Sequence, residues 1–386
     1  GGLTIERFRH AAAAYPTRAL GGTGHPMRTE RPIPYTGSDA AGKPTHAGPG
    51  PSHPTRSPPA TVGTDAVGSR HSHVLLLFVA TALAAGPARA QFLEAETAAS
   101  GPGLGDVRTL KYRVGLVVTA EGGPCSGLYA TLPVPEEWSE QKVRVVEEDV
   151  SPAVRNLRYR TLPGGVKQMV VEIPELPAGK QARAVVTFEL DRAAIVAPSD
   201  TAALQIPEKP DRALKAHLGT SPYIETRDPK ITALAKAAGK GLDGWRKVEA
   251  IYDTVRDKVE YRNGELKGAR RALADGWGDC EELTCLFIAM ARAEGIPART
   301  VWVEGHCYPE FYLVDATGKG WWFPCQAAGT RAFGAMPDQL PILQKGDNFR
   351  DPDRPGKSLR YVSEFLKGAT VKGAGDPRVE WIREGG

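Results

Sequence analysis

The chain has 386 residues, 41% of them hydrophobic and 24% charged, which is enough for two or three domains with apolar cores. Its formal net charge of +4 is uneven, because residues 1–90 hold nine Lys/Arg against four Asp/Glu and the rest of the chain therefore carries about −1. After residue 90, bulk charge indicates neither a nucleic-acid partner nor an anionic membrane surface.

Residues 1–68 are rich in Pro, Gly, Thr and His and show no apolar period. Such a segment cannot bury enough surface to offset the entropy cost of ordering, so we expect it to be disordered. It could also be a mis-annotated extension. On that hypothesis translation starts near Val67, and the first 66 residues do not belong to the native protein.

Residues 69–90 are typical of a signal peptide. Arg70 precedes an apolar run of 12 residues, Val74–Ala85, and Ala88-Arg89-Ala90 has the A-x-A form of a cleavage site. The run is too short to span a bilayer, and no cysteine follows that could carry a lipid anchor. We therefore expect cleavage near Ala90, export to the periplasm or the extracellular space, and no stable membrane anchor. The alternative is a chance apolar stretch in a disordered tail.

Residues 106–197 show short runs rich in Val, Tyr, Thr and Phe, separated by turn signals such as Leu162-Pro163-Gly164-Gly165. Six or seven strands in this length predict an antiparallel sandwich of immunoglobulin-like type, without a catalytic constellation. Residues 198–227 are polar and punctuated by proline, which is typical of a linker, and His217 within it is expected at the surface.

Residues 228–370 change to a mixed pattern. Asp228 and Pro229 mark a helix start, and a second helix has apolar residues at spacings of three and four from Trp245 to Val259. A third helix begins near residue 280 and ends by Gly295, and three strand-like runs follow: ARTVWVE, HCYPEFYLVD and GWWFPCQ. Helices that precede an antiparallel sheet predict an α+β domain.

Cys280 lies at the start of that third helix. Asp279 is a good N-cap, and Glu282 three residues later completes a capping-box signature. Unpaired N–H groups and the helix dipole favour a thiolate at this position, whereas the nearby carboxylates oppose it. A general base is therefore needed. After residue 90 the sequence offers only His217 and His306, and His306 opens the strand that follows.

Three stretches of this domain resemble the transglutaminase-like (papain-like thiol) superfamily: GDCEELTCLFIAMARAEGIPAR, HCYPEFYL and GWWFPCQ. The resemblance covers about residues 228–328. It implies a transglutaminase-like α+β core, often preceded by a β-rich domain. Within it, Cys280 corresponds to the nucleophile and His306 to the general base, and Tyr308 replaces the usual tryptophan.

Gln326 departs from the family pattern. It stands where the family has the aspartate that orients the histidine, if Trp322 and Pro324 align with W-x-P-x-D. A neutral amide can accept a hydrogen bond from the imidazole, but it stabilises imidazolium less than a carboxylate does. The resemblance thus implies a Cys280–His306–Gln326 triad, and the departure keeps open a catalytically inactive protein.

Alternatives remain for several of these residues. Cys280 alone could be a small buried hydrophobe. A zinc site would have to combine five residues without a usual ligand spacing: Cys280, Cys285, His306, Cys307 and Cys325. Aromatic residues could wall a cleft for an extended peptide or simply pack in the core: Trp277, Tyr308, Trp321 and Trp322. No calcium-loop motif is present, and we expect no metal and no cofactor.

Cys307 and Cys325 form a second hypothesis. If His306 and Gln326 face each other on adjacent antiparallel strands, the two cysteines face each other as well. After export they could form a cross-strand disulfide, although two unbonded thiols fit the pattern equally well.

The predicted function is an exported enzyme that transfers acyl groups through a thiol, with a protein or peptide substrate. Water as acceptor would make it a peptidase or amidase, and a lysine amine would make it a cross-linking transglutaminase. The competing prediction is an inactive transglutaminase-like binding or scaffolding protein.

N-terminal sequencing of the protein isolated from its native source tests the export prediction. We expect the first residue to be Gln91, because signal peptidase cleaves after an A-x-A site. Recovery of any peptide from residues 1–60 would overturn the proposed start near Val67.

Overall fold

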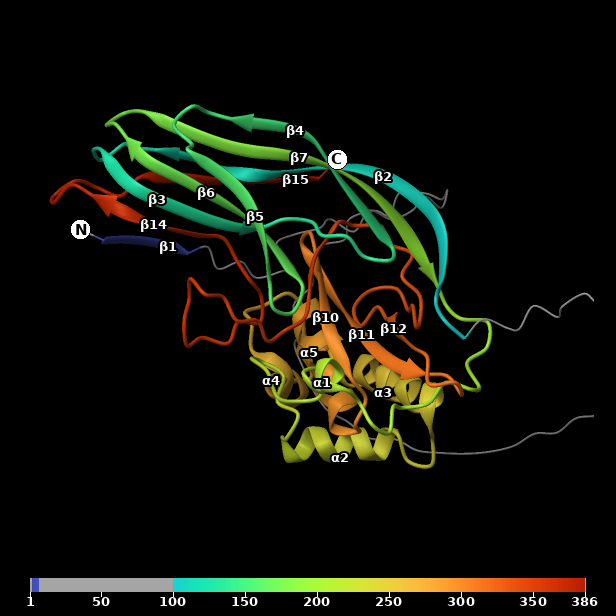
Figure 1. Cartoon of the computed structure of the whole chain (residues 1–386). Helices are drawn as coiled ribbons and strands as arrows, with labels where there is room; N and C mark the ends of the chain where they lie inside the picture. The colour runs from blue at the N-terminus through green and yellow to red at the C-terminus, as the bar shows by residue number, and fades with distance from the viewer. Residues whose placement is uncertain (1, 7–99, 386) are drawn as a thin grey trace, which may run out of the picture. The chain divides into compact units, whose positions relative to one another are not determined.

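The computed structural model describes residues 2–6 and 100–385 (Figure 1). The predicted signal peptide at residues 69–90, its cleavage site and most of the segment expected to be disordered lie outside the described residues. Within the described part, no helix has the length and apolar character needed to cross a membrane.

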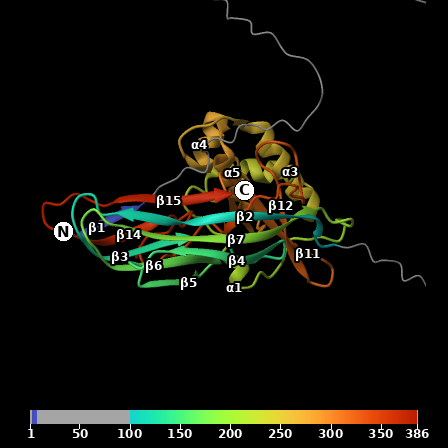
Figure 2. The same cartoon turned by 90° about the horizontal axis from the view of Figure 1, so that it is seen from above.

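Two antiparallel sheets pack face to face as a β-sandwich. The strands of both sheets lie roughly along one common axis, as Figure 2 shows from above. The first sheet has the order β15 (Arg378–Gly385), β2 (Gly103–Thr119), β7 (Gln181–Val196), β4 (Gln141–Val150). The second has the order β1 (Gly2–Glu6), β14 (Phe365–Thr370), β3 (Cys125–Pro133), β6 (Val166–Leu176), β5 (Asn156–Leu162).

Period-two alternation places the sandwich core. Along β2, Tyr112 and Val114 are fully buried, whereas Lys111 and Arg113, which alternate with them, are exposed. The buried residues share one apolar cluster with those of β3, β6 and β7, so both sheets contribute to a single core.

The sandwich extends beyond residues 106–197. Strands β14 and β15 come from the C-terminal end of the chain, so residues 365–370 belong to the sandwich and not to the α+β domain predicted over 228–370. The antiparallel sandwich is observed, but its immunoglobulin-like type is not confirmed. Single short strands such as β14 carry little sequence signal, because a Gly and a Lys interrupt their alternation.

Strand β1 differs from the disorder expected over residues 1–68. It pairs with β14, and Leu3 is buried at 6% exposure. Its apolar alternation covers only Leu3 and Ile5, which is too short to stand out from the sequence around it. A mature protein beginning at Gln91 would lack this strand.

The α+β domain has five helices among the described residues: α1 (Arg212–Lys215), α2 (Pro229–Ala238), α3 (Gly244–Lys258), α4 (Gly268–Asp275) and α5 (Cys280–Ala293). Its antiparallel sheet has the order β12 (Gly320–Pro324), β11 (His306–Val314), β10 (Ala298–Val303), β13 (Ile342–Lys345). A short parallel pair, β8 (Glu260–Tyr261) and β9 (Trp277–Gly278), lies near the start of α5.

Helix α5 is the centre of this domain. It contacts α2, α3 and α4 as well as β10 and β11, and every residue from Cys280 to Arg292 is buried. A helix buried on every side is apolar on most of its circumference, and α5 supplies much of the domain core through residues such as Phe287 and Met290.

The predicted linker at residues 198–227 is packed against the domain. Leu204 and Ile224 are fully buried in the same core as α5. His217 is only partly exposed, because its ring packs edge-on against Trp322 at 5.2 Å between ring centroids. Burial, with a smaller contribution from Arg299, lowers the pKa of His217 to about 4, so it differs from the surface residue we expected.

A buried ion-pair cluster joins the sandwich to the α+β sheet. Lys345 on β13 donates to Glu140, which precedes β4, at 2.7 Å and to Glu310 on β11 at 2.6 Å. All three side chains are at most 4% exposed. Burial opposes the ionisation of Glu140, yet Lys345 holds its pKa at about 2. The lysine therefore lies between two carboxylates that cannot reach bulk water, and Arg299 also pairs with Glu310 at 2.9 Å.

We expect Lys345→Met to destabilise the protein by about 3 kcal/mol at pH 7, because it leaves the buried Glu140 carboxylate without its ion-pair partner, while Glu310 keeps Arg299 at 2.9 Å. In the wild type, the contribution of Glu140 is complete above its usual pKa of 4.5 and disappears as the pH falls towards 2. The difference in unfolding free energy between the variant and the wild type should be smaller near pH 4, where protonation removes the unpaired charge of Glu140. Urea unfolding of both proteins at pH 7 and pH 4 measures this difference.

Arg144→Met is the matched control, since Arg144 also bonds two carboxylates, Glu189 and Asp191, but on the exposed side of the sandwich. It should leave stability nearly unchanged. Equal effects of the two substitutions would contradict the argument.

Candidate active site

The chain around Cys280 is fixed by caps. Helix α4 ends at Gly276, whose φ of 72° turns the backbone into β9, and α5 begins three residues after Trp277. The Asp279 carboxylate accepts from the Glu281 N–H at 2.8 Å, and Glu282 accepts from the Asp279 N–H at 3.2 Å. The predicted capping box is confirmed, and it places Cys280 as the first helical residue.

His306 and Gln326 meet beside the thiol. The Nε2 atom of His306, the first residue of β11, lies 3.0 Å from Oε1 of Gln326. Gln326 follows β12, and helix α3 holds its backbone, because Tyr252 Oη and Arg256 both donate to its carbonyl oxygen. Its own N–H donates to the Ala332 carbonyl at 2.8 Å. The amide is thus held at both its backbone and its tip.

The Cys280 thiol has a pKa well below its usual range. The neighbouring Cys307 thiol, whose Sγ donates to Thr284 Oγ1 at 3.8 Å, contributes most to this lowering, burial opposes it, and the His306 imidazole adds to it. Burial alone would lower the pKa of His306, but its bonds to Cys280 and Gln326 and the charge of Asp338 raise it. The two groups therefore favour a thiolate beside an imidazolium.

The carboxylates near Cys280 oppose the thiolate less than the sequence suggested. Burial and the hydrogen bond with Glu282 raise the pKa of Asp279 to about 8, so this group is mostly neutral at pH 7. Glu281 is ion-paired with Arg360. Glu282 accepts from the backbone N–H groups of Lys267 and Gly268. Each acidic side chain is thus protonated, paired or hydrogen-bonded within the protein.

Cys307 and Cys325 do not face each other. Phe311 on β11 pairs with Phe323 on β12, and the Cys325 N–H donates to the Pro309 carbonyl at 2.9 Å. The register is two residues away from the one that the sequence analysis assumed. Both thiols are free and buried, and Cys307 lies beside Cys280 instead. The chain leaves the ladder after Pro324, which lets Gln326 reach His306 without being its strand partner.

Tyr308 cannot line a cleft beside Cys280. It is 2% exposed and packs with Ile195 of the sandwich, where its hydroxyl lies 3.5 Å from Arg192. Side chains alternate along a strand, so Cys307 and Tyr308 point to opposite faces of the sheet. The prediction that Tyr308 binds substrate was therefore wrong in its choice of face.

The two tryptophans predicted to bind substrate lie in different surroundings. Trp322 contacts His217, and the Arg299 guanidinium lies 4.0 Å from its ring centroid. Trp277 lies close to Cys280 along the chain, and the Lys267 ammonium covers its ring at 3.1 Å from the centroid. A role for either tryptophan in substrate binding stays a prediction.

Three residues near the site were not predicted from the sequence. Asp338 accepts from the Gln326 Nε2 atom at 3.1 Å, Tyr261 is 51% exposed on β8, and Arg360 pairs with Glu281. Burial and the nearby charges of Cys280 and Asp279 raise the pKa of Tyr261, which places its hydroxyl near the thiol. No motif marks any of the three, since each reaches the site from an irregular or very short element.

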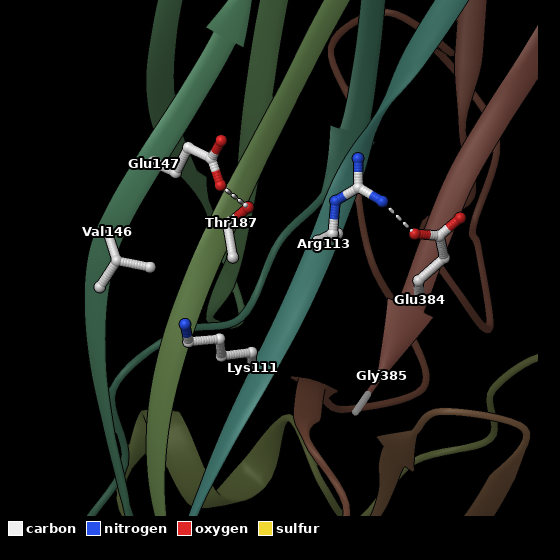
Figure 3. A pocket seen from close by; sticks show the side chains of 7 residues that line it. All are labelled: Lys111, Arg113, Val146, Glu147, Thr187, Glu384 and Gly385. Atoms are coloured by element: carbon white, nitrogen blue, oxygen red, sulfur yellow. Dashed lines mark hydrogen bonds and ion pairs between the residues drawn. The ribbon is translucent and has the colours of Figure 1, made fainter.

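A cavity of about 470 Å³ lies away from this chemistry, on the outer face of the sheet that contains β2 and β7 (Figure 3). It is lined by Lys111, Arg113, Val146, Glu147, Thr187, Glu384 and Gly385. None of these residues is a cysteine, and neither His306 nor Gln326 lies among them. Within residues 2–6 and 100–385, no three His, Cys, Asp or Glu side chains form a group suited to a metal ion.

The family model of the transglutaminase-like superfamily matches residues 232–327. Residues 232–327 form a transglutaminase-like domain. The match spans α5, β10, β11 and β12, and it includes Cys280, His306 and Gln326. No curated protein sequence matches the chain.

Two solved structures resemble this chain at low identity. One, from Cytophaga hutchinsonii and provisionally named a cysteine protease, is 18% identical with a TM-score of 0.47, over 73% of this chain and 92% of that one. The other, from Parabacteroides distasonis and provisionally named a protease, is 14% identical with a TM-score of 0.24, over 60% of this chain and 48% of that one.

Cys307→Ala should raise the pKa of Cys280, because it removes the neighbouring thiol that contributes most to lowering it. We expect the midpoint of alkylation of Cys280 by iodoacetamide to move up by about one pH unit. Cys307→Ser, which keeps a donor, should stay near the wild type.

Cys325→Ala is the control, since Cys325 is an equally buried thiol that lies beside Pro309. If Cys307→Ala has the same alkylation midpoint as the wild type, the Cys307 thiol does not affect the pKa of Cys280.

Proposed function

We propose that this transglutaminase-like protein is an exported thiol enzyme that transfers acyl groups from peptide or carboxamide bonds. The observation that carries the proposal is the buried Cys280 thiol, whose pKa is lowered beside an imidazole held by Gln326. A structural cysteine in an apolar core has a raised pKa, as Cys285 and Cys325 of the same domain do through burial. The contrast within one core supports a chemical role for Cys280.

The reaction begins with attack of the Cys280 thiolate on the carbonyl carbon of the substrate. The C–S bond forms, and the carbonyl oxygen becomes an oxyanion that backbone N–H groups at the start of α5 can stabilise, including that of Cys280. Collapse of this intermediate breaks the C–N bond. His306 gives its proton to the leaving amine, and a thioester remains on Cys280.

A second nucleophile then releases the acyl group. Water or a lysine amine attacks the thioester carbon while His306 removes its proton, and the C–S bond breaks to return the Cys280 thiolate. Attack by water gives a carboxylic acid, and attack by a lysine amine gives a new amide. Gln326 keeps the imidazole in place through both steps, because its Oε1 atom lies 3.0 Å from Nε2. The partner is thus a protein or peptide substrate, and Trp277 and Trp322 remain the aromatic candidates for contacting it.

The export part of the proposal rests on the sequence at residues 69–90. A basic residue, a short apolar run and an A-x-A site support secretion of the mature chain. The immunoglobulin-like interpretation of the sandwich is supported by its two antiparallel sheets.

A second candidate is an inactive transglutaminase-like scaffold. Two observations favour it: Gln326 replaces the aspartate of the family pattern, and Cys280 is only 2% exposed. A substrate would need a local opening to reach the thiol. The two candidates differ in whether the thiol reacts.

Alkylation of the full chain by iodoacetamide at pH 6 separates the candidates. We expect fast modification at a single site, mapped to Cys280 by peptide mass, because a thiolate is the reactive form. His306→Ala should slow it by at least about tenfold, since the imidazolium no longer stabilises the thiolate. Slow or scattered labelling that does not depend on His306 would favour the scaffold.

A substrate assay then identifies the acceptor. Incorporation of a fluorescent primary amine into a glutamine-containing protein would indicate transamidation, and release of new amino groups would indicate hydrolysis. Cys280→Ala should abolish either activity.

A further inference from the structure

Gln326 forms a bridge between His306 and a carboxylate. Its Oε1 atom lies 3.0 Å from His306 Nε2, and its Nε2 atom donates to Asp338 Oδ2 at 3.1 Å. The Gln326 side chain is largely buried, at 9% exposure for the residue. The three groups therefore form a chain that runs from the imidazole to Asp338.

Asp338 determines which way the amide points. A carboxylate only accepts hydrogen bonds, so the NH₂ group of Gln326 must face it, and the amide oxygen must face the histidine. His306 Nε2 then carries a proton and donates it. The other ring nitrogen, Nδ1, is left to accept the proton of the Cys280 thiol. A reversed amide would impose the opposite tautomer, and Nδ1 could not act as a base.

Asp338 also supplies a negative charge near the imidazole. Its charge is one of the causes that raise the pKa of His306 despite burial. Asp338 itself is exposed, so solvent reduces the strength of this effect. The charge nevertheless acts in the direction that an aspartate at position 326 would provide.

The sandwich holds the segment that carries Asp338. Met336 and Ile195 exchange two backbone hydrogen bonds of 2.9 Å, which ties the segment to β7. Gln339 donates from its side chain to the carbonyl oxygens of Arg192 and Asp106. Residues on both sides of Asp338 are thus fixed, although Asp338 lies in an irregular connection.

We propose that Asp338 is a positioning residue for the acyl transfer: it orients the Gln326 amide towards His306 and provides the carboxylate that position 326 lacks. This inference rests on the proposed function. On this proposal, two residues share the role of the family's aspartate: the Gln326 amide contacts His306, and the Asp338 carboxylate accepts a hydrogen bond from that amide.

The exchange of amide and carboxylate between the two positions tests the proposal. Gln326→Glu is nearly isosteric but brings two carboxylates within hydrogen-bond distance of each other. Asp338→Asn keeps the shape and removes both the charge and the constraint on the amide. In Q326E/D338N the carboxylate contacts His306, and the amide introduced at position 338 donates to it, so the chain of bonds is restored in reverse.

The readout is the rate of Cys280 alkylation by iodoacetamide as a function of pH, on the full chain and without any substrate. We expect Asp338→Asn to slow the reaction at pH 6 by about fivefold and to shift its midpoint upwards by somewhat less than one pH unit. Gln326→Glu should also be impaired. The double variant should return close to the wild-type profile, which makes the two substitutions strongly non-additive.

Asp253→Asn is the matched control. Asp253 is a carboxylate at the protein surface that holds the same connection through Arg331, but it does not touch Gln326. It should leave the pH profile unchanged. Thermal unfolding of each variant checks that the fold is intact.

The outcomes separate the two proposals. If the wild type labels fast at Cys280, but Asp338→Asn keeps its midpoint and the double variant shows only the sum of the single effects, the role of Asp338 is wrong and the thiol enzyme stands. If His306→Ala is alkylated at Cys280 as fast as the wild type, His306 does not activate the thiol. The proposed function then fails, whatever Asp338→Asn shows.

Discussion

The N-terminus of helix α5 is buried, and its unpaired backbone N–H groups must find acceptors inside the protein. Asp279 and Glu282 provide these acceptors, and their hydrogen bonds hold the backbone on both sides of Cys280. The Asp279 and Glu281 N–H groups are occupied by these caps, so the donor proposed for an oxyanion is the N–H of Cys280 between them. Burial of α5 is therefore both the source of the domain core and the reason that a reactive group can be held at one end of it.

Charge near this helix end is balanced locally. Asp279 is largely protonated at neutral pH, Glu281 is paired with Arg360, and Glu282 is taken up by backbone donors. The shifts at Cys280 and His306 act in the same sense, because each group's charged form would be balanced by the other's. Buried charges are also balanced between the sandwich and the α+β domain, where Lys345 lies between the carboxylates of Glu140 and Glu310. Buried charges in this protein occur in groups whose sum is small, which is the condition for their ionisation away from water.

Local signals predicted the parts of the site that depend on neighbours in sequence. The capping box at Asp279, the first-turn position of Cys280 and the strand start at His306 all follow from short patterns, and the structure contains each of them. The strand register did not follow, because it depends on how the chain leaves β12 after Pro324. A shift of two residues kept the same face towards α5 but separated Cys307 from Cys325.

Other features depend on contacts that no local pattern encodes. Asp338 reaches Gln326 through a connection that the sandwich holds, so its role is visible only once both domains are folded. Tyr308 was assigned to the cleft because of its residue type, whereas its position one residue after Cys307 places it on the other face. The C-terminal strands escaped notice because their partners, β3 and β2, lie more than 200 residues away.

The return of the chain to the sandwich has a consequence for biosynthesis. The transglutaminase-like domain is inserted between β7 and β14, and strand β15 pairs with β2 near the start of the sandwich. Arg383 on β15 also forms an ion pair of 2.7 Å with the buried Glu364. A chain terminated before β15 would leave β2 as an open edge and Glu364 without its cation. Translation must therefore pass β15 before this sheet is complete, and shorter products expose β2 as an unpaired edge strand.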